Sequence, residues 1–329
     1  MKDVGLVGLP YAGRTTLFRA LTHAGAAGGR ANQAVVPVPD ERLAVLAEME
    51  RSRKVVQAQV RFVDVPGGTG AQGLAALREA DALAVVLRAF GADADPARDL
   101  AEVTADLIVA DLAVLEGVAE RAAKKARGRS QEPAASHEAE VLARAALALH
   151  GERLLRDAGF DDQEAKILRG AGPLTLKPWV IVANLEEGGS VPDGLPEGTV
   201  GVYAAIEAEV AEMDEAEGRA LLAEFGVTEP GLPAVIAASY RALDLVTFLT
   251  TGEDETRAWQ VRRGAHAPEA AGVIHTDLER GFIRAEVVSY DDLVAAGSWE
   301  NAKHQGHLRV EGRDYLVREG DVLHVRFAV

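Results

Sequence analysis

The sequence predicts an α/β fold: a parallel sheet that carries a phosphate-binding loop, an inserted helical hairpin, and a smaller α+β domain at the end. Three observations support this prediction. A loop bounded by two glycines stands between a short apolar run and a helical segment near the N-terminus. Short apolar runs alternate with helical segments over the first ~100 residues, as in βαβ units. Two long helical patterns come next, and strand-like pieces separated by glycines follow them.

The N-terminal loop has the residue pattern of a nucleotide-binding loop. Residues 8–15, Gly-Leu-Pro-Tyr-Ala-Gly-Arg-Thr, match G-x-x-x-x-G-K-[ST] at every defined position except the lysine. The glycines let backbone N–H groups turn inward around phosphates, and the Thr15 hydroxyl is a ligand for Mg²⁺. The apolar run 4–7 and the helical spacing after the loop supply the expected strand and helix. The predicted nucleotide contacts in this loop are Tyr11, Ala12, Gly13, Arg14, Thr15 and Thr16.

Arg14 occupies the position where the pattern has lysine. A guanidinium binds phosphate, but its planar fork is bulkier than an ammonium and is not a compact point charge. The loop therefore predicts nucleotide binding without predicting hydrolysis.

Asp64 follows the apolar run 60–63, within Asp-Val-Pro-Gly. The carboxyl ends of parallel strands form the ligand-binding edge of such a sheet. We therefore expect Asp64 to hold Mg²⁺ together with Thr15, and the Gly67 N–H to approach the terminal phosphate. The same residues are typical of a simple turn at the end of a strand. Their position one strand after the phosphate loop favours the nucleotide interpretation.

Asn184, Leu185 and Glu187 follow another predicted strand, 179–183. An amide there ties neighbouring loops together, and a carboxylate accepts hydrogen bonds from ring N–H groups of a base. Switches that recognise guanine have Asn-Lys-x-Asp at such a position, so Leu185 and Glu187 weaken a guanine preference. An Asn-initiated turn into an acidic loop explains the residues equally well, and spacing alone leaves both interpretations open.

Helical spacing dominates the middle of the chain and predicts an antiparallel hairpin over residues 101–176. Its first helix has apolar positions at 112, 115, 119, 122 and 126, its second at 142, 146 and 149, and residues 127–133 have the composition of a turn. Short apolar runs that predict strands occur again at residues 179–183, 200–203 and 234–238. The first domain is therefore expected to comprise residues 1–100 and 177–248.

The last part of the chain, residues 249–329, is predicted to be a small α+β domain. Its expected strands are 258–261, 282–288, 315–317 and 322–327.

Composition restricts the possible functions. The formal net charge of −16 argues against a general nucleic-acid coat, and the lack of cysteine excludes disulfides and thiolate metal sites. No apolar run has transmembrane length and no signal-peptide pattern is present, so we expect a cytoplasmic protein without a membrane partner.

One local basic run departs from this acidic balance. The predicted hairpin tip contains no acid between residues 121 and 129 but holds Arg121, Lys124, Lys125, Arg127 and Arg129. Such a run suits RNA phosphate. A solvated helix end explains it too, because cations stabilise helix C-termini.

The chain resembles the YchF branch of the Obg-like P-loop NTPases over nearly its whole length. The matching stretches are residues 5–10, 36–43, 177–187 and, most specifically, 271–287. The resemblance implies a Ras-like domain interrupted by a helical hairpin, and a C-terminal TGS domain with a ubiquitin-like fold. It also implies association with ribosomes and base recognition by Asn184 and Glu187, with ATP preferred over GTP.

Several positions depart from the pattern of that family. Arg14 replaces its lysine, residues 23–34 carry no hydroxyl side chain for a Mg²⁺-sensing threonine, and Gly68 replaces a hydrophobic residue. Ala204 replaces a serine near the base. Two hypotheses follow: a slow ATP- or GTP-hydrolysing switch on the ribosome, or a degenerate paralogue that senses nucleotide or serves as a scaffold there without hydrolysis. No catalytic residue is identified, and a vestigial nucleotide site is a third interpretation.

Overall fold

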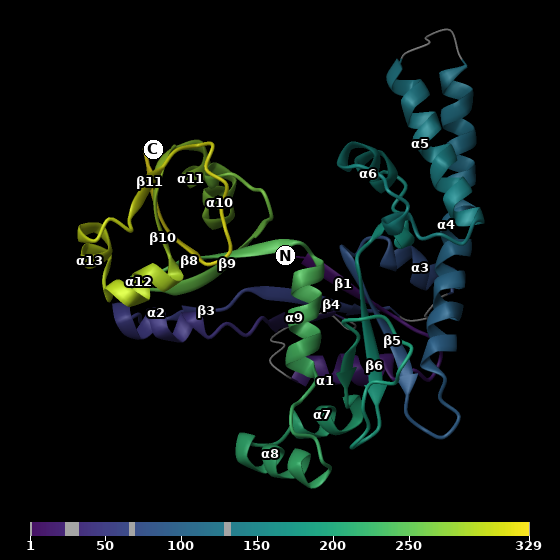
Figure 1. Cartoon of the computed structure of the whole chain (residues 1–329), viewed down its shortest axis with the longest axis horizontal. Helices are drawn as coiled ribbons and strands as arrows, with labels where there is room; N and C mark the ends of the chain where they lie inside the picture. The colour runs from purple at the N-terminus through teal and green to yellow at the C-terminus, as the bar shows by residue number, and fades with distance from the viewer. Residues whose placement is uncertain (1, 24–32, 66–69, 128–132, 329) are drawn as a thin grey trace. The chain divides into compact units, whose positions relative to one another are not determined.

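The computed structural model describes residues 2–23, 33–65, 70–127 and 133–328 (Figure 1). The chain forms two compact units. The first comprises Met1–Val36 and Val60–Leu243, and the second comprises Pro37–Gln59 and Asp244–Val329. Residues 37–59, expected in the first domain, thus fold together with the C-terminal part of the chain.

The sheet of the first unit has the strand order β2-β4-β1-β5-β6-β7. β1 pairs in parallel with β4 and β5, and β6 pairs in parallel with β5 and β7. The carboxyl ends of these strands meet at one edge, which is where ligands bind in such sheets. This confirms the predicted α/β fold. The strands are Lys2–Val7 (β1), Gln33–Pro37 (β2), Gln59–Asp64 (β4), Ala82–Ala89 (β5), Trp179–Leu185 (β6) and Val200–Val202 (β7).

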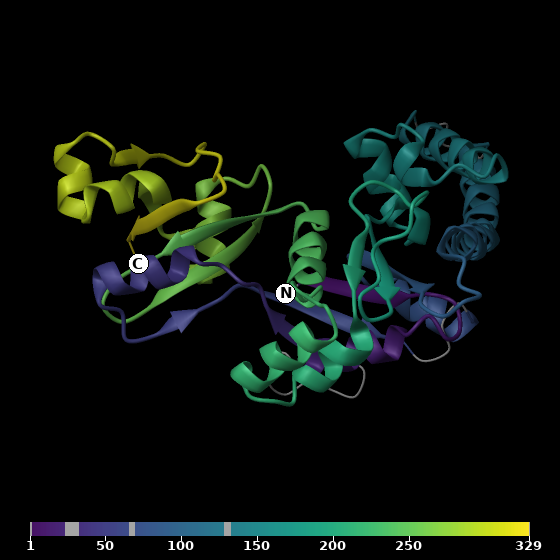
Figure 2. The ribbon, with the colours of Figure 1, turned by 60° about the horizontal axis from the view of Figure 1, so that its bottom comes forward.

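Helices cover both faces of this sheet (Figures 1 and 2). α3 (Ala71–Leu77) and α4 (Pro96–Ala126) lie on one side, and α1 (Arg14–His23) and α9 (Leu232–Ala242) lie on the other. Residues 82–87 of β5 are consequently all buried, as is usual for a central parallel strand. Two further helices, α7 (Ala204–Val210) and α8 (Glu215–Glu224), follow β7.

The strand prediction for residues 234–238 was wrong, because they belong to helix α9. The helix has a proline in its first turn, and its buried positions recur at helical spacing: Leu232, Val235, Ile236, Ser239 and Tyr240. Periodicity over five apolar residues does not separate a strand from a buried helix. The flanking residues extend the pattern to eleven positions, which is the length of a helix.

α4 and α5 (Pro133–His150) form the predicted antiparallel hairpin (Figure 1). α4 begins at Pro96, where the Asp95 side chain accepts a hydrogen bond from the Arg98 N–H. Ile108, Leu115 and Ala122 of α4 share an apolar core with residues of α5. Most of the expected turn, residues 128–132, lies outside the described residues. The chain returns to β6 through α6 (Asp162–Arg169) and two 3₁₀ turns, Leu155–Asp157 and Leu174–Leu176.

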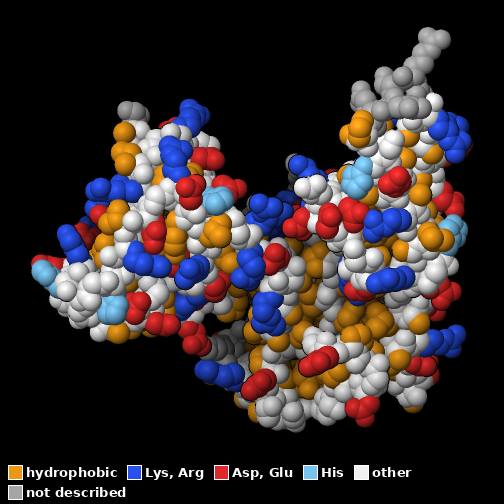
Figure 3. Space-filling view, turned by 45° about the horizontal axis from the view of Figure 1, so that its top comes forward, with side chains coloured by type: hydrophobic (Ala, Val, Ile, Leu, Met, Phe, Trp, Pro, Cys, Tyr) orange, Lys and Arg blue, Asp and Glu red, His pale blue; other side chains and the backbone are white. Residues whose placement is uncertain are grey.

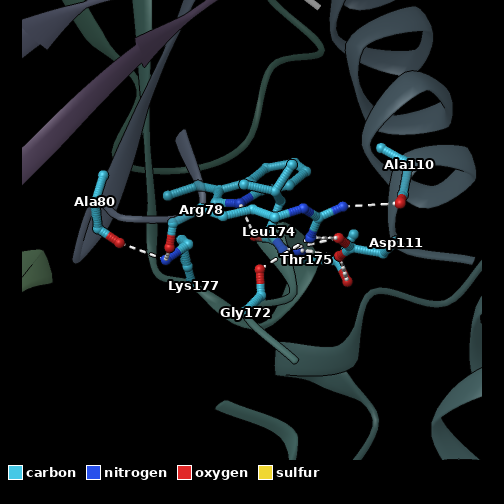
Figure 4. Close-up of polar contacts among 9 residues, drawn as sticks. Arg78, Ala80, Ala110, Asp111, Gly172, Leu174, Thr175 and Lys177 are labelled. Atoms are coloured by element: carbon cyan, nitrogen blue, oxygen red, sulfur yellow. Dashed lines mark hydrogen bonds and ion pairs between the residues drawn. The ribbon is translucent and has the colours of Figure 1, made fainter. Parts of the chain in front are cut away.

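A buried carboxylate joins the base of this hairpin to the sheet (Figure 4). Asp111 of α4 is fully buried and accepts hydrogen bonds from Arg78 Nη1 (2.7 Å), the N–H groups of Leu174 and Thr175 (3.0 and 2.7 Å), and the Thr175 hydroxyl (2.7 Å). Lys177 Nζ donates to the carbonyl oxygens of Arg78 and Ala80, and burial lowers the pKa of this lysine. The carboxylate is therefore both paired and fully hydrogen-bonded.

The sheet of the second unit has the order β11-β10-β12-β8-β9-β3. β8 and β9 form an antiparallel hairpin, β10 is antiparallel to β11 and β12, and β12 runs parallel to β8 in the centre. With α10 packed on it, this is a ubiquitin-like arrangement, as expected. The strands are Val55–Val56 (β3), Leu245–Thr250 (β8), Thr256–Arg262 (β9), Phe282–Ser289 (β10), Arg309–Glu311 (β11) and Asp321–Phe327 (β12).

Helices lie on both sides of this second sheet as well (Figure 1). α10 (Ala267–Ile274) and α11 (Thr276–Arg280) lie on one side, and α2 (Arg42–Glu50) and α12 (Tyr290–Ala296) lie on the other. α13 (Trp299–His304) follows α12. The expected strand 315–317 was wrong: Leu316 makes only an isolated bridge to His266, because this segment pairs with the turn before α10.

Polar contacts explain why residues 37–59 belong to the second unit. β3 pairs in parallel with β9, and Arg42 bonds both Asp40 and Glu319, with Nη2 at 2.7 and 2.8 Å from the two carboxylates. The hydrogen bonds that Arg42 donates to the Asp40 carboxylate are the main cause that raises the pKa of Arg42. Glu319 also accepts the Thr247 N–H, so it links α2 to β8. Among the described residues, no helix is long and apolar enough to cross a membrane.

Candidate nucleotide-binding site

The loop between β1 and α1 has a backbone that requires its glycines. Gly13 has φ +83°, in the left-handed region, and a Cβ there would overlap Asn184 Nδ2. A Cβ at Gly8 would overlap the carbonyl oxygen of Val86, so the loop lies directly against β5. Both defined glycines of the sequence pattern are thus needed for close packing, and Gly13 is needed for its conformation as well.

Tyr11 also has a left-handed conformation, with φ +67°, and its side chain is 90% exposed. A non-glycine residue in this region costs conformational energy and is uncommon outside special sites. Ala12 is buried, and Thr16 is half-buried in the first turn of α1. The loop therefore exposes Tyr11 while Ala12, next to it, is buried.

Asn184 connects the loop to two other elements. Its side chain is buried at the end of β6; Nδ2 donates to the Ala12 carbonyl at 3.1 Å, and Oδ1 accepts the Ala204 N–H at 3.2 Å. The amide thereby fixes the distance between the phosphate loop, β6 and the start of α7. The proximity of Ala12 and Asn184, 172 positions apart, follows from the order of the strands in the sheet.

Asp64 lies at the end of β4 and contacts the first two residues of α1. Its Oδ2 accepts the Thr15 hydroxyl at 3.1 Å, and its Oδ1 lies 2.7 Å from Arg14 Nε. The Arg14 and Asp64 side chains are only 16% and 9% exposed. Although the two atoms are close, their geometry is not that of a hydrogen bond, and both are buried without any hydrogen-bond partner among the described residues.

These residues fit a magnesium–phosphate ligand. A hydroxyl and a carboxylate are the oxygen donors that Mg²⁺ takes from proteins, and Asp64 Oδ1 is a buried acceptor without a hydrogen bond. Arg14 Nε is likewise a buried donor without a hydrogen-bond partner among the described residues, and phosphate oxygens are strong acceptors. The structure places the Thr15 hydroxyl on Asp64, and it also places Arg14 beside this carboxylate, a contact that the sequence pattern did not predict.

The predicted base-binding residues differ in their exposure to solvent. Leu185 is buried, whereas Glu187 is exposed and makes no hydrogen bond to the described part of the chain. The neighbouring Glu186 accepts the Gly91 N–H at 3.2 Å, which links this loop to the loop after β5. Glu187 is therefore available to a ligand, and its role stays a prediction.

Glu207 is a positioning residue that the sequence analysis missed. Its buried carboxylate accepts the N–H groups of Tyr203, Gly231 and Leu232 at 3.0, 2.8 and 2.8 Å. It thereby joins the start of α7 to the start of α9, next to the Ala204 N–H that bonds Asn184. The sequence gives no distinctive signal for it, because the segment Ala204–Val210 holds two acids, Glu207 and Glu209, among apolar residues.

The hairpin tip presents cations at the end of α4 (Figure 3). Arg121, Lys124, Lys125 and Arg127 are exposed. Lys124 pairs with Glu120 at 2.8 Å and Lys125 with Glu138 at 3.4 Å. Two of the predicted contact residues, Arg129 at this tip and Gly67 in the nucleotide site, lie outside the described residues.

Comparisons with known proteins cover the whole chain. The family model described as "YchF-GTPase_C: Protein of unknown function (DUF933)" matches residues 245–328. The "Ribosome-binding ATPase YchF" of Haemophilus influenzae is 39% identical over 360 residues, and that of Bacillus subtilis is 38% identical over 366 residues; each alignment covers 99% of both chains. The solved structure of the Schizosaccharomyces pombe YchF GTPase has a TM-score of 0.88 and 27% identity, and it covers 99% of this chain and 97% of that one.

Proposed function

The chain belongs to the YchF family, and on this premise we propose that it is a ribosome-associated, nucleotide-binding P-loop protein of the cytoplasm. The proposed ligand is ATP, with GTP as a weaker alternative, bound with Mg²⁺ and hydrolysed slowly. The observation that carries the proposal is the connected site: the left-handed Gly13, the Asn184 amide on the Ala12 carbonyl, and Thr15 beside Asp64.

The residues of the site have separate proposed roles. Backbone N–H groups of residues 11–16 bind the phosphates at the N-terminus of α1, where the helix dipole favours an anion. Thr15 and Asp64 hold Mg²⁺, which neutralises phosphate charge when bound. Gly67 approaches the terminal phosphate, and Asn184, Leu185 and Glu187 contact the base.

We propose slow turnover because several residues that would stabilise the transition state of hydrolysis differ from the family pattern. Arg14 replaces the lysine of the pattern, and its guanidinium forms an ion pair with Asp64. No hydroxyl side chain is present in residues 23–34 to close over Mg²⁺. Each lost contact to developing charge typically costs on the order of 10²-fold in rate. The aligned length of 360 positions also exceeds the 329 residues here, so the chain lacks residues that the Haemophilus influenzae relative has.

The second candidate function is a non-hydrolysing paralogue that senses nucleotide or serves as a scaffold on the ribosome. The ion pair between Arg14 and Asp64 favours it, because it engages the two charged side chains at the proposed magnesium and phosphate positions. Single-turnover hydrolysis of labelled ATP separates the candidates: slow release of phosphate supports the first, and bound, unchanged ATP supports the second.

Base preference tests the nucleotide proposal. We expect ATP to bind more tightly than GTP, and Glu187→Ala to reduce this preference by roughly three- to tenfold, because a charge-assisted hydrogen bond contributes on the order of 1 kcal/mol. Isothermal titration with ATP, ADP, GTP and GDP in Mg²⁺ measures it. The matched control is Glu197→Ala, an exposed acid in the same β6–β7 connection. A GTP preference that survives in Glu187→Ala contradicts the assignment.

Ribosome binding through the hairpin tip is the second test of the proposal. We expect Lys124→Gln/Lys125→Gln/Arg127→Gln to weaken co-sedimentation with ribosomes and to reduce its salt dependence, because fewer phosphate counterions are released. The control triple variant Arg98→Gln/Lys166→Gln/Arg169→Gln removes the same charge from exposed positions elsewhere in the unit. Equal binding by both triple variants refutes the contribution of the tip.

A further inference from the structure

We propose that Arg14 is a built-in counter-ion for Asp64, so that this site binds nucleotide with little dependence on a divalent cation. The inference rests on the proposed nucleotide site and deepens it. It concerns the effect of the Arg14 charge on the Asp64 carboxylate at the proposed phosphate position.

The geometry places a positive charge on the carboxylate before any ligand arrives. Arg14 Nε lies 2.7 Å from Asp64 Oδ1, and the Thr15 hydroxyl donates to Oδ2 at 3.1 Å. Oδ1 thus has an ion-pair contact but no hydrogen bond, Oδ2 accepts a hydrogen bond, and both contacts come from consecutive residues at the start of α1. A divalent cation that approaches this carboxylate meets a guanidinium already beside it.

Burial makes the charge on Asp64 important for an anionic ligand. The Asp64 side chain is 9% exposed, so solvent screens its charge poorly. A nucleotide phosphate that enters without a metal ion would be repelled by an uncompensated carboxylate. Arg14 removes that repulsion, which is the electrostatic contribution that a divalent cation would otherwise make.

Arginine suits this double task better than lysine. Its guanidinium carries several donors in a fixed plane, so one nitrogen can face the carboxylate while others remain for phosphate oxygens. In this structure it is Nε that faces Asp64, so the two Nη atoms of the fork are the donors that we assign to phosphate. A lysine ammonium is a compact point charge without this fork of separated donors, so it is less suited to contact the carboxylate and the phosphates at the same time.

The experiment compares nucleotide affinity with and without divalent cations. A fluorescent ATP analogue is titrated into the full chain in excess MgCl₂ and in excess EDTA. We expect the two dissociation constants of the wild-type protein to differ by less than about threefold, because Arg14 already balances Asp64. In Arg14→Gln we expect them to differ by more than about tenfold, through weaker binding in EDTA.

Two further variants make the result specific. Arg14→Gln/Asp64→Asn removes both charges, and its affinity in EDTA is expected to exceed that of Arg14→Gln but to stay below the wild-type value, because the repulsion by Asp64 is gone while the contact of Arg14 with phosphate is lost as well. Arg19→Gln, at an exposed position on the same helix, is the control for loss of one positive charge. Circular dichroism melting curves verify that each variant is folded.

The outcomes separate this inference from the proposed function. A wild-type difference above about tenfold between MgCl₂ and EDTA overturns the inference, whatever the variants do, and leaves nucleotide binding in place. An unchanged ratio in folded Arg14→Gln overturns it as well. Absence of binding in both buffers refutes the proposed function itself.

Discussion

Replacing Gly13 with valine is expected to lower nucleotide affinity by more than about a hundredfold, since strained backbone and displaced packing each cost on the order of 1–3 kcal/mol. Gly13 has φ +83°, which a β-branched residue adopts only with strain, and its Cβ would overlap Asn184 Nδ2. The amide would have to leave the Ala12 carbonyl, so the loop would lose the bond that fixes it to β6. Isothermal titration with ATP measures the loss.

A second glycine provides the control for backbone strain. Gly159 also lies in the first unit and has φ +76°, but a Cβ there meets no atom within 4 Å. Gly159→Val should therefore cost stability through strain while it leaves nucleotide affinity unchanged. If Gly13→Val binds ATP as tightly as the wild-type protein, the loop is not the phosphate site.

Removal of the buried carboxylate of Asp111 is expected to have the largest effect on stability. Asp111→Ala leaves the N–H groups of Leu174 and Thr175 without their acceptor in a buried environment, and it leaves the Arg78 guanidinium with backbone carbonyls but no carboxylate (Figure 4). Breaking such a pair on one side typically costs about 3–5 kcal/mol. The expected result is a lower midpoint of urea unfolding for the first unit.

The chain offers a local fluorescent reporter for this measurement. Of its three tryptophans, Trp179 belongs to the first unit, and its Nε1 donates to the Leu174 carbonyl within the same network. Trp259→Phe/Trp299→Phe therefore leaves a signal from the first unit alone. Glu120→Ala is the control, because it breaks an exposed pair with Lys124 on the same helix, which is worth less than about 0.5 kcal/mol. Equal midpoints for the two variants would show that Asp111 is not a major contributor.

Local patterns predicted much of the fold because they combine periodicity with strong boundary signals. β1, β4, β5 and β6 contain apolar runs, of which β1 is followed by Gly8 and β4 ends at Asp64, and the hairpin helices keep helical spacing over many turns. Residues 234–238 and 315–317 failed because a short apolar run has the same composition in a buried helix, a strand or a loop that packs on a core.

The grouping of residues 37–59 with the second unit had no local signal. β3 consists of only two residues, and Val55 and Val56 pair with Thr256 and Arg257, about 200 positions later. Arg42 likewise finds Glu319 far along the chain. Contacts at such separations depend on the order of strands in a sheet, which the sequence pattern of one segment does not contain.

The sequence by itself determined the glycine-bounded loop after β1, its arginine, Thr15, Asp64, and the asparagine near the end of β6 as candidate site residues, because each is a residue type at a required spacing. Only the tertiary structure decided which of these side chains meet. It placed Asn184 on the Ala12 carbonyl and Arg14 beside Asp64, and it supplied Glu207 as a link between α7 and α9. The physical reason is that ion pairs and hydrogen bonds act over a few ångströms, and parallel strand order brings distant residues within that range.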